Sequence, residues 1–289
     1  MSRIALGTVQ FGLNYGVANN AGRVSGGDAK AILEVAKKSG IDVLDTAVLY
    51  GDSEKNLGQL GTSGFNIITK LPALPEGQVN VYGWVRQQAQ DSLNRLGIES
   101  LHGLLLHRSE QLLGPNGAEI YRGLQSLKDD AMVSKIGLSI YSSAELIDIF
   151  GHYKFDIIQA PFNLIDRELD TSGWMDKLKD LDVEIHSRSA FLQGLLLMNE
   201  ADIPARFFAW KGLFHKWHRW VEEFGYTKLE ACMAFPLQYP QIDRVIVGVD
   251  TASQLSQIIE ATKHISINNL PDIQSSDQNL VNPVNWSDA

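Results

Sequence analysis

The stretch VLDTAVLYGDSE, residues 43–54, decides the fold. It begins as a short apolar strand, becomes polar at Asp45 and passes through Gly51 to a helix start at Ser53. Tyr50 follows Asp45 by five residues, so both side chains are expected near one mouth, where α/β enzymes carry their chemistry. Asp-Thr pairs also cap turns, and Tyr before Gly is a common loop pair, so the stretch alone is equally consistent with an ordinary turn.

Two later strands sharpen that choice. Lys70 ends the apolar run NIITK, and His107 ends the run LLLH. Three successive strands then each present an ionisable group at the C-terminal end, which favours a catalytic cluster over a turn. Lys70 alone would indicate a structural ion pair with Asp45, and His107 alone a satisfied histidine at a strand end. With Tyr50 added, the four residues form a group that can carry out acid–base chemistry, so catalysis is the preferred hypothesis.

Short apolar strands alternate with amphipathic helices eight times along the chain, which predicts an α/β fold of the closed (β/α)8 TIM-barrel type. Ser25 has capping-box spacing at the start of one helix, and Gly97 stops another. A length of 289 residues suits one such barrel, so we expect a single domain over residues 1–289. Strands are expected at residues 3–6, 43–45, 66–69, 101–106, 135–139, 157–160, 183–187 and 245–248.

One segment between the last two strands departs from the alternation. Four of its side chains lie at spacings of three and four, and they predict one face of a helix packed on the barrel: Phe214, Trp217, Val221 and Phe224. We prefer core packing to a cation-rich aromatic surface for nucleic acid. Phe207, Phe208 and Trp210 lie outside that face and are candidates for a lid over the mouth. The polar tail from Ile267 is expected to wrap or fray without forming an element.

Composition limits the possible cellular location and binding partners of the protein. No run of about 18 apolar residues occurs, and the N-terminus carries no signal-peptide pattern, so we expect a cytoplasmic protein with no membrane contact. Cys232 is the single cysteine, which excludes an internal disulfide framework, and its neighbours indicate helix core rather than a reactive thiol. The net charge of −9 disfavours non-specific nucleic-acid binding but permits an anionic cofactor held by local dipoles and a few cations.

The motif DTAVLYGDSEKNLG, residues 45–58, resembles the signature that follows the second barrel strand in the aldo-keto reductase family. Lys70 and His107 match the other two members of that family's catalytic tetrad, and the resemblance extends over nearly the whole chain. It implies an NAD(P)H-dependent oxidoreductase that interconverts an aldehyde, ketone or sugar-like carbonyl and an alcohol. The runs LGTVQFGLNYG, from residue 6, and RSAFLQG, from residue 188, are similar to a bacterial subgroup associated with surface-polysaccharide or nucleotide-sugar pathways.

Carbonyl reduction gives each member of the tetrad a role. A free tyrosine has a pKa of about 10, too high for an efficient acid at neutral pH. A nearby buried ammonium lowers that pKa, and the ammonium itself needs a carboxylate partner. We therefore expect Asp45 to hold Lys70, and Lys70 to lower the pKa of Tyr50, which donates the proton. His107 would donate a hydrogen bond that orients the substrate oxygen.

The cofactor is inferred from the resemblance, since no strand-linked G-x-G-x-x-G or Walker motif occurs. The resemblance implies an extended NAD(P) across the C-terminal face of the barrel, with Ser139 and Gln159 at the carboxamide and Asn163 as a weaker candidate. Arg188 stands where the family places a ring-stacking residue, and a guanidinium plane can stack on an aromatic ring. The remaining candidates are Thr8 and Gln10 at the nicotinamide ribose, and Ser187, Ser189, Phe191, Gln193 and Gly194 in the loop around the pyrophosphate.

Several positions depart from the family pattern and affect the choice between NADP and NAD. Two residues after Gly248 the family usually carries Lys or Arg for the 2′-phosphate, whereas this chain has Asp250. A carboxylate repels that phosphate and can accept hydrogen bonds from a free ribose diol. Gln257 and Ile258 replace the usual Glu-Asn at the adenine, and Ile140 replaces an asparagine. None of these changes touches the tetrad.

Two other classes of function remain open on sequence grounds. One is a non-catalytic nicotinamide-binding module that senses redox state or regulates a partner. The other is a Schiff-base lyase or aldolase that uses Lys70 as its nucleophile. For the preferred reductase hypothesis we expect a small-molecule carbonyl substrate as the partner, no nucleic acid, no membrane and no metal site. His102 and His186 lie elsewhere on strands and are taken as structural.

Overall fold

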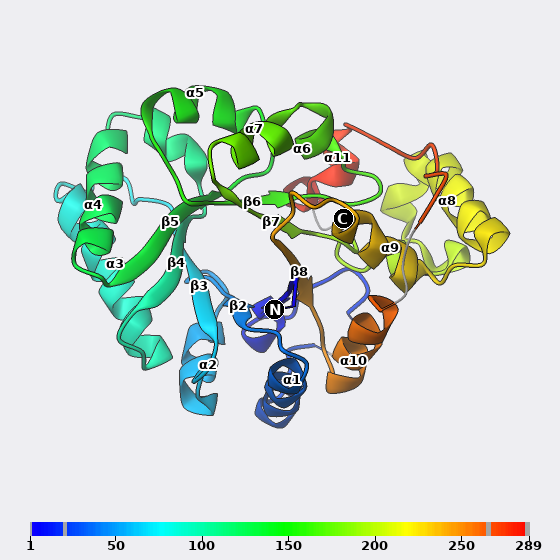
Figure 1. The fold of residues 1–289 in the computed structure, drawn as a ribbon, viewed down its shortest axis with the longest axis horizontal. Helices are drawn as coiled ribbons and strands as arrows, with labels where there is room; N and C mark the ends of the chain where they lie inside the picture. Colours follow the sequence, from blue (N-terminus) through cyan, green and yellow to red (C-terminus); the bar gives the residue numbers. More distant parts are fainter. Residues whose placement is uncertain (1, 20–21, 264–266, 287–289) are drawn as a thin grey trace.

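The computed structural model describes residues 2–19, 22–263 and 267–286. Eight parallel strands close into a barrel in chain order, as the alternating pattern predicts, and helices surround it (Figure 1). Pairing of β1 with β8, in which Gly7 lies opposite Gly248, completes the closure. The strands are β1 (Ile4–Gly7), β2 (Val43–Asp45), β3 (Asn66–Leu71), β4 (Leu101–Leu106), β5 (Val133–Ser139), β6 (Ile157–Pro161), β7 (Glu184–Arg188) and β8 (Arg244–Gly248).

The first and third helices show how local sequence satisfies free backbone groups at helix ends. Ser25 accepts a hydrogen bond from the Asp28 amide at the start of α1, and Gly97 ends α3 in the left-handed region with φ 66°. The helices are α1 (Gly26–Lys38), α2 (Ser53–Leu60), α3 (Val81–Leu96), α4 (Gly117–Asp129), α5 (Glu145–His152), α6 (Glu168–Thr171), α7 (Trp174–Asp180), α8 (Lys211–Phe224), α9 (Lys228–Leu237), α10 (Ala252–Ala261) and α11 (Gln278–Val281). Among the described residues, none of these helices is long and apolar enough to cross a membrane.

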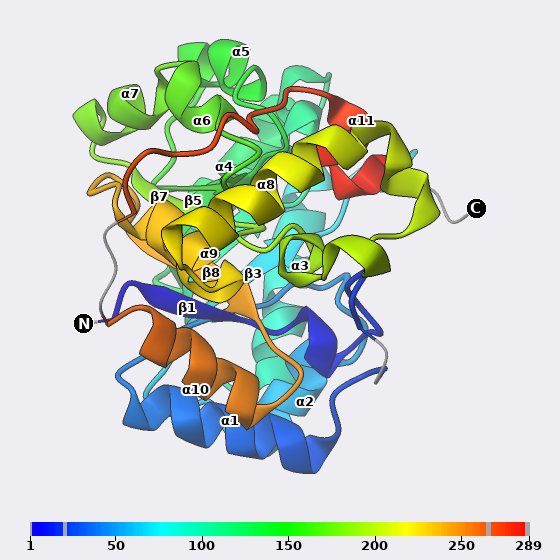
Figure 2. The same ribbon diagram turned by 90° about the vertical axis from the view of Figure 1, so that its right-hand side faces the viewer.

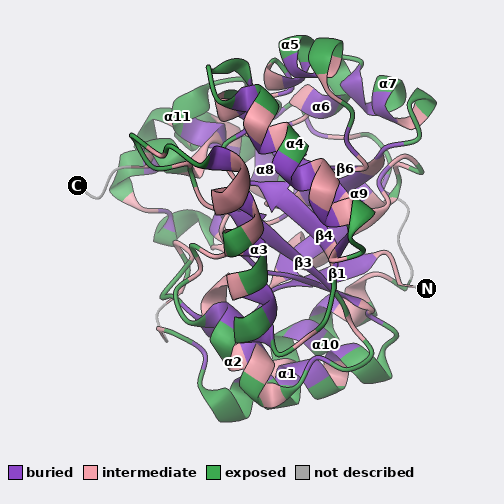
Figure 3. Ribbon diagram, turned by 90° about the vertical axis from the view of Figure 1, so that its left-hand side faces the viewer, coloured by how far each residue is buried: buried purple, intermediate pink, exposed green. Residues whose placement is uncertain are grey.

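The core has two layers, one inside the barrel and one between the strands and the helices. The strands are buried, whereas the outer faces of the helices are exposed (Figure 3). Cys232 is buried in α9, as the neighbouring residues predict, and burial raises the pKa of its thiol. The inner layer consists of Ala5, Val43, Ile68, Leu105, Ile157 and Ile246, which fill the lumen below the mouth.

The aromatic segment forms the predicted helix, and three of the four residues of its predicted apolar face are buried. Phe214, Trp217 and Val221 on α8 are buried, while Phe224 is 39% exposed. The proposed lid is wrong for Phe207, which is fully buried and packs edge-on against Trp286 with ring centroids 4.9 Å apart. Phe208 and Trp210 do not line the cavity at the mouth either.

The C-terminal tail also differs from the expectation, because it forms a short helix. Leu280 and Val281 of α11 are buried, and this burial orders a segment whose sequence is mostly polar. The tail lies alongside α8 (Figure 2), where the Trp220 Nε1 donates to the Asn269 carbonyl at 2.7 Å. The tail therefore covers α8 instead of the mouth.

The helix that follows the Tyr50 loop, α2, packs closely against α3, and this packing can be tested at Gly58. A Cβ atom at Gly58 would lie 2.2 Å from the Arg95 carbonyl oxygen, whereas one at Gly151 on α5 meets no described atom within 4 Å. Gly58→Ala should lower the free energy of unfolding by about 1–3 kcal/mol. Gly151→Ala should raise it by up to about 1 kcal/mol, because alanine favours a helix over glycine. Urea denaturation measures both, and equal shifts would contradict this packing.

Candidate active site

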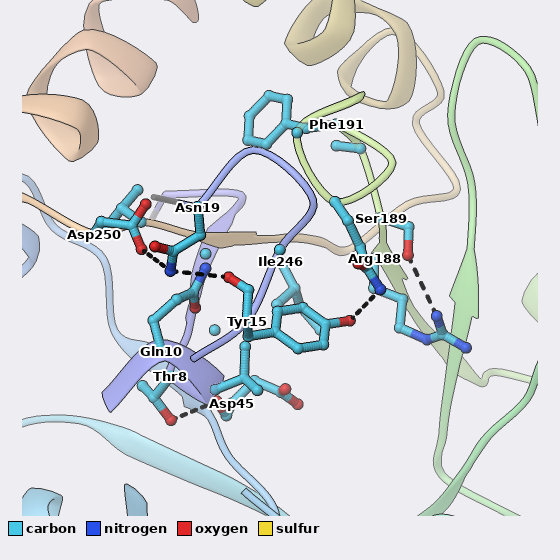
Figure 4. A pocket seen from close by; sticks show the side chains of 18 of the residues that line it. Thr8, Gln10, Tyr15, Asn19, Asp45, Arg188, Ser189, Phe191, Ile246 and Asp250 are labelled. Carbon is cyan, nitrogen blue, oxygen red and sulfur yellow. Dashed lines mark hydrogen bonds between the residues drawn. The ribbon is translucent and has the colours of Figure 1, made fainter. Parts of the chain in front are cut away.

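A cavity of about 710 Å³ opens at the C-terminal ends of the strands (Figure 4). The loops after β1, β2, β7 and β8 contribute most of its walls. All of the predicted site residues line it except Lys70 and Ser187, which are fully buried beside it. Ser187 lies nearest the Arg244 carbonyl, at 3.4 Å, and Asn163 donates to the Ser189 carbonyl away from the cavity. Topology thus brings together groups that are far apart in the sequence.

Asp45, Lys70 and Tyr50 form a connected chain of polar groups. The Lys70 Nζ donates to the Asp45 Oδ2 at 2.6 Å, to the Thr46 carbonyl at 2.9 Å and to the Tyr50 hydroxyl at 3.5 Å. An ammonium has three protons and no lone pair, so these three acceptors use all of its donors. The Tyr50 oxygen must accept from Lys70, which leaves its own O–H free to donate elsewhere.

The pKa of Tyr50 differs from the sequence-based expectation. Burial raises it above its ordinary value of 10, and the Asp45 carboxylate raises it further, whereas Arg188 lowers it. Lys70 does not reverse this shift, because its ammonium lies 2.6 Å from Asp45 but 3.5 Å from the phenol. Burial also lowers the pKa of Lys70 itself, against the effect of Asp45. Tyr50 is therefore held as the neutral phenol, which is the proton-donating form.

A hydrogen bond across the barrel closes the floor of the cavity. Strands four places apart in a closed eight-stranded barrel lie opposite each other, as β2 and β6 do. The Gln159 Nε2 nevertheless donates to the Asp45 Oδ1 at 2.7 Å, so the two side chains meet over the lumen. Ser139 lies beside them, with its hydroxyl 3.5 Å from the Gln159 Oε1. Both oxygens of Asp45 are thus engaged, one by Lys70 and one by Gln159.

His107 forms part of the wall next to Tyr50. The two rings meet edge to face, with centroids 6.1 Å apart. Burial lowers the pKa of His107 to about 3, and the positive charges of Lys70 and Arg188 lower it as well. The imidazole is therefore neutral at physiological pH, and its buried Nδ1 has no hydrogen-bond partner among the described residues. A neutral imidazole facing a cavity can donate one hydrogen bond to a ligand.

The β1 loop forms a strap over the cavity. The Thr8 hydroxyl donates to the Asp45 carbonyl at 2.9 Å, which fixes the start of the loop. Further along, the Gln193 side chain donates to the Tyr15 hydroxyl at 3.1 Å, and Val17 donates to the Gln193 carbonyl. Figure 4 shows Tyr15 reaching across the cavity toward the β7 loop. The strap thus joins the loops after β1 and β7.

Asp250 occupies the far end of the cavity. The Asn19 side chain lies 3.3 Å from the Asp250 Oδ1, and the Asp250 amide donates to the Gln254 Oε1 at 2.7 Å. Burial raises the pKa of Asp250. Gln257, which also lines the cavity, lies in the second turn of α10. The cavity therefore runs from the tetrad to the start of α10.

The structure adds five polar cavity residues that were not predicted from the sequence: Tyr15, Asn19, Tyr141, Lys228 and Gln254. The position of Lys228 was the easiest of these to infer from the sequence, because it follows Thr227 in a capping box that starts α9. Its Nζ is held by the Met198 carbonyl at 2.7 Å. Tyr15 and Asn19 lie in a glycine-rich loop without periodicity, which gave no signal.

The cavity has features that fit an extended dinucleotide. The buried Gln10 Oε1 has no hydrogen-bond partner among the described residues, so it is available to a ligand donor such as a ribose hydroxyl. A Cβ atom at Gly248 would lie 2.5 Å from the Gln10 side chain, and one at Gly194 would lie 2.7 Å from the Ala18 Cβ. Glycine at both positions lets the strap close without a clash.

Known proteins resemble this chain in sequence and in fold. L-glyceraldehyde 3-phosphate reductase of Escherichia coli O157:H7 is 23% identical over 88% of this chain and 84% of its own length. D-threo-aldose 1-dehydrogenase of a Pseudomonas species is 26% identical over 86% of this chain and 88% of its own. The solved structure of aldo-keto reductase AKR11C1 from Bacillus halodurans has a TM-score of 0.74 at 17% identity, covering 92% of this chain and 88% of that chain.

Fold, relatives and site together define an oxidoreductase of the (β/α)8 barrel class that acts on carbonyl compounds. The chain belongs to the aldo/keto reductase family, whose model matches residues 3–277. The resemblance carried by the motif at residues 45–58 is thereby confirmed.

The neutral state of His107 can be tested by following its ring protons in NMR spectra. Its pKa lies below the ordinary 6.5, so the folded state favours the neutral ring, and that stabilisation is lost only as pH falls from 6.5 toward 3. The His107 signal, assigned by its loss in His107→Gln, should not shift between pH 8 and pH 5. A midpoint near 6.5 would contradict the buried position.

Proposed function

We propose that this protein reduces a small aldehyde, ketone or sugar-like carbonyl with NAD(P)H, or catalyses the reverse reaction. The main support is the hydrogen-bonded chain from Asp45 through Lys70 to Tyr50, because it leaves a neutral phenol whose proton is free to enter the cavity. Names of two relatives, a sugar-phosphate reductase and an aldose dehydrogenase, support a sugar-like substrate.

Tyr50 acts as the proton donor in this proposal. As negative charge develops on the carbonyl oxygen, the phenol transfers its proton, and the Lys70 ammonium stabilises the resulting phenolate across 3.5 Å. Asp45 keeps Lys70 in place through the 2.6 Å contact. The lysine therefore serves mainly after proton transfer, when the tyrosine becomes negative.

His107 orients the carbonyl. A neutral imidazole donates a hydrogen bond without supplying a competing acidic proton, so Tyr50 remains the only acid of the pair. Its position beside the Tyr50 ring places both groups against one end of the cavity. A carbonyl oxygen within reach of both would be held and protonated at the same point.

NAD(P)H supplies the hydride when bound, and this chain's residues hold it along the cavity. Ser139 and Gln159 offer polar groups at the floor for the carboxamide. Lys228 and the loop that contains Gln193 stand at the middle, where a pyrophosphate would need a cation and backbone donors. Asp250 at the far end favours a free ribose diol over a 2′-phosphate.

The Schiff-base alternative is disfavoured by the environment of Lys70. Its side chain is fully buried, does not line the cavity and uses all three protons on fixed acceptors. A nucleophilic lysine needs a neutral amine that a carbonyl carbon can approach. Burial lowers the pKa of Lys70 and Asp45 at 2.6 Å opposes that shift, so it is the inaccessibility of the amine to the cavity that disfavours this route.

Tyr50→Phe should reduce turnover by at least about 100-fold, because the proton donor is lost. Cofactor affinity should stay within a few-fold, since the ring and its packing remain. Steady-state kinetics and fluorescence titration measure the two quantities, with Tyr82→Phe on α3 as the matched control. Near-native turnover of Tyr50→Phe would refute the role of Tyr50. A wild-type protein that binds cofactor but reduces no carbonyl would support the sensor hypothesis instead.

Cofactor preference gives a second test, by parallel titration with NADH and NADPH followed through tryptophan fluorescence. Wild type should bind NADH more tightly, because Asp250 repels a 2′-phosphate. Asp250→Asn should tighten NADPH binding by roughly ten-fold and change NADH binding less. Glu222→Gln, the same change of charge on the exposed side of α8, should alter neither. Strong NADPH preference in wild type would contradict the assignment of Asp250.

A further inference from the structure

Arg188 faces the tetrad from the opposite wall of the mouth. It is the last residue of β7, and β7 lies opposite β3, the strand of Lys70, in the closed barrel. The bond between Asp45 and Gln159 forms the floor between these walls. Tyr50 and Arg188 both line the cavity above that floor. A hydride donor beside a carbonyl at Tyr50 must therefore lie in the space that Arg188 bounds.

The guanidinium of Arg188 is fixed in place but not neutralised by an ion pair. Its Nη2 donates to the Ile140 carbonyl at 2.8 Å, its Nη1 to the Ser189 hydroxyl at 3.3 Å, and it stacks on the Tyr141 ring at 4.6 Å. Among the described ranges, no carboxylate forms an ion pair with it. Asp166 lies near enough for Arg188 to lower its pKa, yet burial raises that pKa to about 7.

The charge of Arg188 already acts across the mouth. It lowers the pKa of His107 and of Tyr50 on the facing wall, and it lowers the pKa of the buried Lys70. A ring placed between the walls is closer to the guanidinium than those groups are. A positive charge on that ring would therefore be repelled by Arg188, and more strongly than a positive charge on His107 or Lys70.

We propose that Arg188 makes the site selective for the reduced form of the nicotinamide cofactor. The inference depends on the proposed function, because it requires the nicotinamide ring to occupy the mouth. Oxidation of the cofactor removes a hydride, which consists of one proton and two electrons. The hydride passes to the carbonyl carbon, and its loss leaves a positive charge on the nicotinamide ring. The reduced ring is neutral and the oxidised ring is a cation, so the guanidinium destabilises the oxidised form alone. Binding is thereby biased toward carbonyl reduction and release of the oxidised cofactor.

The test compares the dissociation constants of the oxidised and reduced cofactor by calorimetry, using whichever of NAD or NADP binds more tightly. Wild type should bind the reduced form at least roughly ten-fold more tightly. Arg188→Gln keeps a planar polar group without charge, and it should lower that ratio by roughly ten-fold, mainly through tighter binding of the oxidised form. The midpoint potential of the bound cofactor would fall by about 30 mV for a ten-fold change. Arg188→Lys retains the charge and should keep most of the preference.

Lys228→Gln is the matched control, since Lys228 is another cation that lines the cavity and is held by the Met198 carbonyl on the β7-loop side. This change should weaken binding of the oxidised and the reduced cofactor equally, and so leave the ratio of their dissociation constants unchanged. An unaltered ratio in Arg188→Gln, or equal binding of both forms by wild type, would overturn the role of Arg188 while the proposed function stands. Failure of wild type to bind either form would overturn the proposed function and this inference together.

Discussion

The buried ion pair between Asp45 and Lys70 is the interaction on which the rest of the site depends. A fully buried ammonium is tolerated because a carboxylate at 2.6 Å offsets its lost hydration, and removing either partner would cost about 3–5 kcal/mol. Gln159 holds the second oxygen of Asp45 from across the lumen. One carboxylate thereby links β2, β3 and β6. The loop with Tyr50 begins directly after it, so the position of the phenol follows from the same pair.

The charges at the mouth act on Tyr50 in opposite directions. Asp45 and burial favour the neutral phenol, whereas Arg188 favours the phenolate. The balance at rest keeps the proton on Tyr50, which suits a group that must donate it. In the proposed reaction the tyrosine becomes negative after it donates its proton, and Lys70 and Arg188 on facing walls would both stabilise it. Burial is the main reason that His107 is neutral, and the charges of Lys70 and Arg188 lower the pKa of its ring further.

The fold and the convergence of the four residues that match the family's tetrad could be predicted from the sequence, because both depend on local pattern. In a parallel barrel all strands end at one face, so Asp45, Lys70 and His107 had to converge once their strands were recognised. The direction of the Tyr50 pKa shift could not be predicted, since it depends on the burial of the phenol and on its proximity to Asp45, which only the packed structure shows. Phe207 and the tail were misjudged because a buried contact with Trp286 is invisible in either segment alone. Tyr15 was missed because its loop has no periodicity.

The strap over the cavity also determines when the site is completed during biosynthesis. Tyr15 and Gln193 are 178 residues apart, and Asp45 and Gln159 are 114 apart. Contacts of such long sequence separation form late, because the entropy of loop closure must be overcome first. The residues from Asp45 to Tyr50 are therefore synthesised early, before the contacts of Gln159 with Asp45 and of Gln193 with Tyr15 can form. The cavity is therefore complete only once β7 and its loop have folded onto the earlier strands.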